Sequence, residues 1–269
     1  MSTIATKPLP GTSIDPDYPD SDGEPMGESG FHVEAILHLF SALKNFFRQR
    51  DDVHVAADMF LYYERGKPSA CKAPDVMVTF GVVGNHLRRS FRTWEEGVAP
   101  AVIFEVTSRK TRREDEIVKP QVYASLGVKE YFRFDPEGDS AKLALAGYRL
   151  HGGVYRPLEF NQAGMLTSLE LGTSLEAEFP FLRLTELRTG CRLLSDIEMG
   201  EQLVETQRIL GAERSRVEAQ RLIAEAEHER AEAEHERAEA ERERANAESK
   251  RVAELETELA RLRAERKQN

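Results

Sequence analysis

Apolar residues recur at two different spacings along the chain, and the changes of spacing mark the elements that we expect. Over residues 31–48 the apolar positions fall three or four apart, which is typical of an amphipathic helix with one buried face. These positions are Val33, Ile36, Leu37, Phe40, Leu43 and Phe47. The sequence therefore predicts a helix over 31–48 that packs on the rest of the domain.

Alternating or continuous apolar runs then predict strands. The first run is 53–61, the second follows Pro74 at 75–80, and the third, 102–107, is almost wholly apolar and typical of a central strand. A helix ending near Gly127 precedes a fourth strand at 131–134. Further along, the pattern predicts a hairpin of 142–150 with 154–160 and more β structure over 166–179.

The tail follows a repeat of seven residues. Ala224, Ala231 and Ala238 continue a series that starts at Leu203, and residues 225–244 repeat the motif EAEHERA almost without change. We expect one long charged helix over 200–269. A coiled coil needs a second apolar position in each repeat of seven. In this tail that second position is mostly glutamate, and it is apolar only at Leu255 and Leu262. A homodimer through this helix and a solvated single helix both stay open.

Charge and composition narrow the class of protein. The net charge is −10, and residues 1–30 contain six acidic residues against one lysine, so we expect a disordered acidic arm there. No apolar stretch approaches the roughly 20 residues of a membrane span, and no signal pattern opens the chain. Two cysteines make no disulfide framework. We expect a cytoplasmic protein without membrane contact, with one domain over 31–195.

Two carboxylates on the middle strands form the candidate reactive centre. Asp75 follows a proline at the start of one strand, and Glu105 interrupts the apolar run of the next. An unpaired buried charge is costly, so Glu105 needs a cation. Neighbouring strands lie about 4.8 Å apart, which lets the two carboxylates share one ion, and oxygen ligands suit Mg²⁺.

The helix after the third strand adds a cation to these carboxylates. Asp115, Lys119 and Tyr123 are spaced by four and form one stripe. A metal lowers the pKa of a bound water, and a lysine beside it can orient or deprotonate that water. Carboxylates, metal and lysine together indicate phosphodiester hydrolysis.

The same residues form an ordered series of motifs. The series runs Ala73-Pro-Asp75, then Phe104-Glu-Val-Thr-Ser108, then Asp115-x-x-x-Lys119-x-x-x-Tyr123, then Gly127-Val-x-Glu-Tyr131-Phe-x-x-Asp135-Pro136. Over residues 30–190 it resembles the Uma-type restriction endonuclease family of the PD-(D/E)XK nuclease superfamily. The resemblance implies an α/β fold of the restriction-endonuclease type: a mixed sheet of at least four strands flanked by helices. The residue pattern adds C-terminal β hairpins and the long C-terminal helix.

The resemblance also implies a Mg²⁺-dependent DNA nuclease site, in which Mn²⁺ would substitute. Asp75, Glu105 and the backbone carbonyl of Val106 would bind the metal, and Lys119 would assist the attacking water. The chain departs from the superfamily at Thr107, where a lysine is usual. Pro120 directly after Lys119 predicts a kink, which would either aim Lys119 inward or distort the site.

Plainer structural roles stand beside these assignments. Asp75 could be a strand-entry cap, and Glu105 a buried ion-pair partner of Arg109 or Lys110. Asp115 suits a cap or an ion pair with Lys119 better than a metal ligand, although it stays a candidate ligand. On the first helix, Glu34 is a further candidate ligand, ahead of His32. The candidates for binding DNA phosphates are the basic residues Arg88, Arg89, Arg92, Lys110, Arg112 and Arg113.

Two functions follow. The first is a Mg²⁺-dependent DNA endonuclease that uses Asp75, Glu105 and Lys119. The second is an inactive nuclease-like module that binds or assembles partners through a coiled-coil tail, which the acidic net charge and Thr107 favour.

Overall fold

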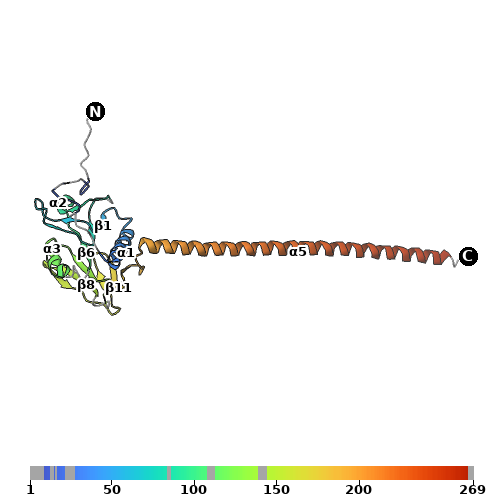
Figure 1. Cartoon of the computed structure of the whole chain (residues 1–269). Coiled ribbons are helices and arrows are strands. Elements are labelled where there is room, and N and C mark those ends of the chain that lie inside the picture. Colours follow the sequence, from blue (N-terminus) through green and yellow to red (C-terminus); the bar gives the residue numbers. More distant parts are fainter. Residues whose placement is uncertain are drawn as a thin grey trace, which may run out of the picture. The chain divides into compact units, whose positions relative to one another are not determined.

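The chain forms two compact units, Met1–Glu201 and Gln202–Asn269 (Figure 1). The computed structural model describes residues 9–12, 15, 17–21, 28–83, 86–107, 113–138 and 144–265, with side chains up to residue 257. In the second unit the described chain is the continuation of helix α5, Asp196–Glu265, whose described side chains from residue 202 onwards are all exposed.

A six-stranded mixed sheet is the centre of the first unit, in the order β1-β4-β6-β7-β8-β9. The expected strands form it. Their bounds are β1 Val53–Ala57, β4 Val76–Phe80, β6 Val102–Val106, β7 Glu130–Phe134, β8 Leu145–His151 and β9 Val154–Pro157. Strands β6 and β7 run parallel, and the other pairs are antiparallel. The α/β fold expected from the sequence is thus confirmed.

The connection between β6 and β7 contains the helical segment of the candidate site. It consists of one π-helical turn, η1 (Glu114–Val118), followed directly by helix α3 (Lys119–Ser125). A parallel strand pair requires such a crossover. Gly127, with φ +79°, then ends the segment and returns the chain to β7.

The two faces of the sheet bury different side chains. Val102, Phe104 and Val106 of β6 point into one core, together with the apolar stripe of helix α1 (Gly30–Phe46). Ile103 points to the opposite core, where Tyr123 of α3 and Tyr131 of β7 pack. Because side chains alternate along a strand, Glu105 projects to the face that α3 covers.

Smaller elements complete the unit. Strands β10 (Leu166–Ser168), β11 (Thr173–Glu178) and β12 (Phe181–Glu186) form an antiparallel sheet that joins the core on the α1 side. Strands β2 (Leu61–Tyr62), β3 (Cys71–Lys72) and β5 (Phe91–Arg92) form a third sheet, followed by helix α2 (Thr93–Glu96). The sequence pattern had not predicted β3, β5 or β12.

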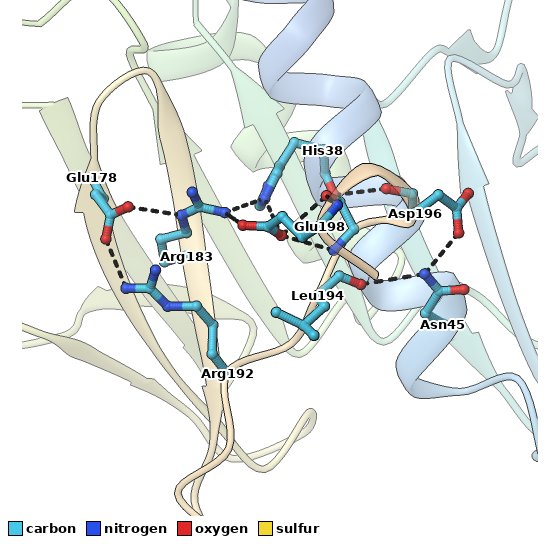
Figure 2. Close-up of polar contacts among 10 residues, drawn as sticks. His38, Asn45, Glu178, Arg183, Arg192, Leu194, Asp196 and Glu198 are labelled. Atoms are coloured by element: carbon cyan, nitrogen blue, oxygen red, sulfur yellow. Dashed lines mark hydrogen bonds and ion pairs between the residues drawn. The ribbon is translucent and has the colours of Figure 1, made fainter. Parts of the chain in front are cut away.

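Within the first unit, a polar network connects the first turn of α5 to α1 and β12 (Figure 2). Ser195 and Glu198 form a capping box: Ser195 N–H donates to the carboxylate at 2.9 Å, and Glu198 N–H donates to Ser195 Oγ at 3.4 Å. The same carboxylate contacts His38 of α1 and Arg183 of β12. Among the described residues, no helix has the length and apolar character needed to cross a membrane.

Gly147 lies where the central sheet packs closely against β10. A Cβ at this position would lie 2.8 Å from Phe132 Cε1 and 2.9 Å from Leu166 Cδ1. We expect Gly147→Ala to lower the free energy of unfolding by about 1–3 kcal/mol through overpacking, measured by urea denaturation. Ala146→Ser on the neighbouring position should change it by less than about 0.5 kcal/mol. Equal stability of the two variants would contradict this packing.

Candidate active site

Asp75 and Glu105 lie opposite each other on adjacent strands. Val76 pairs with Phe104 in the antiparallel β4–β6 ladder, and one further step of that register brings Asp75 to Glu105. Asp75 Oδ2 accepts a hydrogen bond of 2.6 Å from the backbone N–H of Val106. Directly opposed side chains in such a ladder have Cβ atoms about 4.5–5.5 Å apart. The two carboxylates are therefore close neighbours on one face of the sheet.

The Glu105 carboxylate is wholly buried, at 0% exposure, and both of its oxygens are bonded. Lys119 Nζ donates to Oε2 at 2.7 Å, and Tyr123 OH donates to Oε1 at 2.7 Å. Arg109 and Lys110, the ion-pair partners considered from the sequence, lie outside the described residues. Among the described residues, the cation that contacts Glu105 is Lys119.

The π-helical turn brings Lys119 to this position. The Lys119 N–H donates to the carbonyl of Glu114, five residues earlier. In a regular α-helix the ring of Pro120 would clash with the carbonyl four residues before it. The wider turn relieves that crowding and also changes the direction in which Lys119 points. Of the two outcomes expected from Pro120, the structure has the first: Lys119 points inward and is only 9% exposed.

Asp115 belongs to the same buried cluster. It is 1% exposed, and its Oδ1 lies 2.8 Å from Lys119 Nζ, across one helical turn. Its backbone carbonyl accepts a hydrogen bond of 2.7 Å from Tyr131 OH, which holds η1 against β7. The lysine therefore bridges two carboxylates, Glu105 and Asp115, and the stripe predicted from the spacing of four is one contiguous group.

His32, and not Glu34, is the residue of α1 that faces the carboxylates. His32 Nε2 lies 4.0 Å from Asp75 Oδ1, and its ring is 5% exposed. Glu34 is exposed and lines a different cavity beside His38. A signal for this choice exists in the sequence, because His32 precedes Ala35, Ile36 and Leu39 by three, four and seven residues and so continues the buried stripe.

The charges of the cluster do not balance. Three carboxylates face one ammonium group, and burial raises the pKa of Asp75 to about 6 despite the opposing effects of Lys119 and the Val106 N–H. Burial and the Asp75 charge raise the pKa of Glu105 well above its usual range. Burial alone would lower the pKa of Lys119, but Glu105 and Asp115 outweigh it and raise the pKa. Lys119 is therefore an ammonium ion at neutral pH.

This excess of negative charge is what a divalent cation would neutralise. Mg²⁺ needs only one or two carboxylates, with waters and substrate oxygens as its other ligands, and Asp75 with Glu105 meets that requirement. Buried polar atoms without a hydrogen-bond partner surround the pair: His32 Nδ1, Thr107 Oγ1 and Asp115 Oδ2. Within the described residues, no three His, Cys, Asp or Glu side chains form a ready-made metal cluster. The donor set fits a hydrated metal better than a closed protein cage.

Three of the basic residues that were candidates for phosphate binding are engaged inside the protein. Arg88 pairs with Glu96 at 2.6 Å, and both side chains are almost fully buried. Arg92 pairs with Asp15 at 3.2 Å and with Glu95 at 3.1 Å. Arg89 pairs with Asp20 at 2.9 Å. Lys110 and Arg112 lie outside the described residues. These three arginines thus hold other parts of the chain, including the acidic N-terminal segment.

The raised pKa of Asp75 predicts a pH-dependent cost in the metal-free protein. Because the folded state binds this proton more tightly than the unfolded state, the favourable contribution is complete below about pH 4 and is lost as the pH rises through about 6. A shift of about two pH units corresponds to about 3 kcal/mol. Urea denaturation with EDTA should show Asp75→Asn gaining that much over the wild type between pH 4 and pH 7. Parallel curves for the two proteins would contradict the assignment, and Glu159→Gln should follow the wild type.

Comparisons with known proteins give one family match and one distant structural match. No curated protein matches the chain. A crystal structure of a putative nuclease belonging to DUF820 from Anabaena variabilis is a distant match, with 12% sequence identity, a TM-score of 0.40, and coverage of 55% of this chain and 76% of that one. The sequence model of the family described as "Uma2: Putative restriction endonuclease" matches residues 9–184, which is more than half of the chain. The protein therefore belongs to the Uma2 family of nucleases.

Proposed function

We propose that the protein is a Mg²⁺-dependent DNA endonuclease of the PD-(D/E)XK type that acts in the cytoplasm. One observation carries the proposal: a carboxylate at 0% exposure in a central strand, next to a second carboxylate and bound by a buried lysine. A purely structural domain gains little from such a group, because its desolvation is costly. Membership of a nuclease family gives the reaction class.

Each residue has a stated part in this proposal. Asp75, Glu105 and the Val106 carbonyl would hold Mg²⁺, or Mn²⁺ in its place. When bound, the ion would lower the pKa of its water and neutralise charge that develops on the scissile phosphate. Asp115 also contacts the Lys119 ammonium group, at 2.8 Å, and would position it.

Lys119 acts as a cation and not as a base. Its pKa is raised by Glu105 and Asp115 even though burial opposes that shift, so the amine keeps its proton at neutral pH. A buried ammonium group stabilises negative charge on a phosphate oxygen and orients the attacking water. Tyr123 donates to Glu105 and keeps the carboxylate directed at Lys119.

The alternative is a nuclease-like module without activity that binds a partner. Thr107, which is buried two residues after Glu105 where superfamily members have lysine, favours it. The two functions differ in one respect: only the first requires that divalent metal binding and DNA cleavage depend on the same carboxylates.

We expect the full chain to bind Mn²⁺ or Mg²⁺ by calorimetry, and Asp75→Ala to lose that binding. With Mn²⁺ present, Glu105→Gln and Lys119→Gln should each lower the rate of DNA nicking at least about 100-fold, because each removes a charged group of the reacting centre. Only Glu105→Gln should also weaken metal binding. Glu159→Gln and Lys129→Gln are the matched surface controls.

Two results would contradict the proposal. One is undiminished nicking by the Lys119→Gln and Glu105→Gln variants, which would indicate a contaminating nuclease. The other is a folded wild-type protein that neither binds Mn²⁺ nor nicks single-stranded, double-stranded or branched DNA, which favours the inactive module.

We also propose that the tail pairs two copies of the chain. Leu203, Leu210 and Val217 recur every seven residues and are 54–59% exposed, and a helix with such a row buries it by pairing. We expect sedimentation equilibrium to give a dimer that the triple substitution to Ser makes monomeric. Triple substitution of the exposed Glu205, Glu213 and Glu218 to Gln should leave the dimer intact. A monomeric wild type at 100 µM would contradict pairing.

A further inference from the structure

The outer edge of strand β1 carries backbone groups that pair with nothing in the described chain. β1 is the terminal strand of the central sheet, with β4 as its one neighbour there. Asp58 N–H donates to the carbonyl of Asp75, and Gly81 N–H donates to that of Asp52. In an antiparallel ladder, hydrogen-bonded pairs alternate with unbonded ones. The N–H and C=O groups of Val53, Val55 and Ala57 therefore point away from β4.

A cavity of about 540 Å³ runs along this edge. All five residues of β1 line it. Because successive side chains point to opposite faces of a sheet, a cavity on one face would touch only alternate residues, so this cavity must follow the backbone edge itself. Its walls are the C-terminal half of α1 on one side and residues 86–88 on the other.

The groove is recessed and contains an unsatisfied polar side chain. Of the outward-facing residues, Val53 is 2% exposed, and Val55 and Ala57 are half-buried, so the edge is partly covered by its surroundings. His54, at 7% exposure, lines the groove, and its Nε2 has no hydrogen-bond partner in the described chain. Buried backbone and imidazole groups without partners are costly, and a bound ligand with its own donors and acceptors would satisfy them.

The shape of the groove selects an extended peptide. A free, apolar strand edge accepts another strand through main-chain hydrogen bonds. A second copy of this chain would have to bring its own β1 edge forward, and that edge is recessed between the same two walls. A single extended segment of about five residues, roughly 17 Å long, fits where a sheet does not.

The charges of the groove select an acidic peptide. Lys44 and Arg48 are exposed at its α1 wall, and neither has a carboxylate partner among the described residues. Asp196 is the one carboxylate among the described lining residues, and Asn45 Nδ2 donates to it at 2.8 Å (Figure 2). Burial, and to a smaller extent the nearby Arg88, His86 and Lys44 charges, lower the pKa of His54 to about 3, so its imidazole is neutral at physiological pH.

We propose that the β1 groove binds an extended, acidic segment of a partner protein as an additional strand. The main chain of the peptide pairs with Val53, Val55 and Ala57, and its acidic side chains face Lys44 and Arg48. This interaction surface is separate from the carboxylate cluster, and it does not depend on nuclease activity.

The test uses the full chain and the fluorescein-labelled, end-capped peptide Thr-Glu-Val-Glu-Val-Thr. We expect saturable binding in fluorescence anisotropy. The same peptide with N-methylated valines, which cannot donate from those positions, should bind at least 10-fold more weakly, as should Thr-Lys-Val-Lys-Val-Thr. Absence of binding at 1 mM protein, or equal binding of the N-methylated peptide, would overturn the proposal.

Substitutions in the groove test the same interaction from the side of the protein. Val55→Pro removes one outward N–H and no β1–β4 hydrogen bond, which an edge strand tolerates, and it should weaken binding at least 10-fold while Val55→Ile does not. If Val55→Pro fails to fold, the exposed pair Lys44→Glu and Arg48→Glu carries the test, and it should reverse the preference between the acidic and basic peptides. Unchanged binding by the folded variants would overturn the proposal.

Discussion

The buried charge of Glu105 is the constraint around which this domain is organised. A carboxylate in the middle of a six-stranded sheet cannot be left without a cation and a hydrogen-bond donor, and the chain supplies both from the segment that follows β6. Meeting this need requires α3 to pack on the face of β6 from which Glu105 projects. The apolar core and the cluster around Glu105 are packed together, because Tyr123 belongs to the core and also donates a hydrogen bond to Glu105.

Much of the fold could be predicted because the apolar patterns of the central strands and of α1 are strong. Residues 102–107 are nearly all apolar, and the strand lies at 102–106. The short strands β3 and β5 were not predicted, because a strand of two residues is too short to show an alternating pattern. β12 was missed although Leu182 and Leu184 alternate with polar and charged residues as in a half-buried strand, so its signal was present in the sequence.

The sequence predicted which residues form the candidate site better than it predicted the contacts that they make. Asp75, Glu105, Lys119 and Asp115 meet as expected, because strand pairing and a spacing of four dictate it. The direction of the Lys119 side chain could not be predicted, because Pro120 indicates a kink but not which way the kink turns the helix. The π-helical turn in the structure shows that direction. The arginines at 88, 89 and 92 seemed free for phosphates because their acidic partners Glu96, Asp20 and Asp15 come mostly from distant segments.

The position of Lys119 on a helical segment, and not on strand β6, has a consequence for biosynthesis. If the cation were two residues after Glu105, on β6 itself, the two carboxylates and the cation would all be in place once β4 and β6 had paired. Here the cation and the hydroxyl come from residues 119 and 123, on a separate element. A nascent chain that ends before Tyr123 cannot complete the cluster, so an incomplete translation product lacks the assembled centre even if its strands have formed.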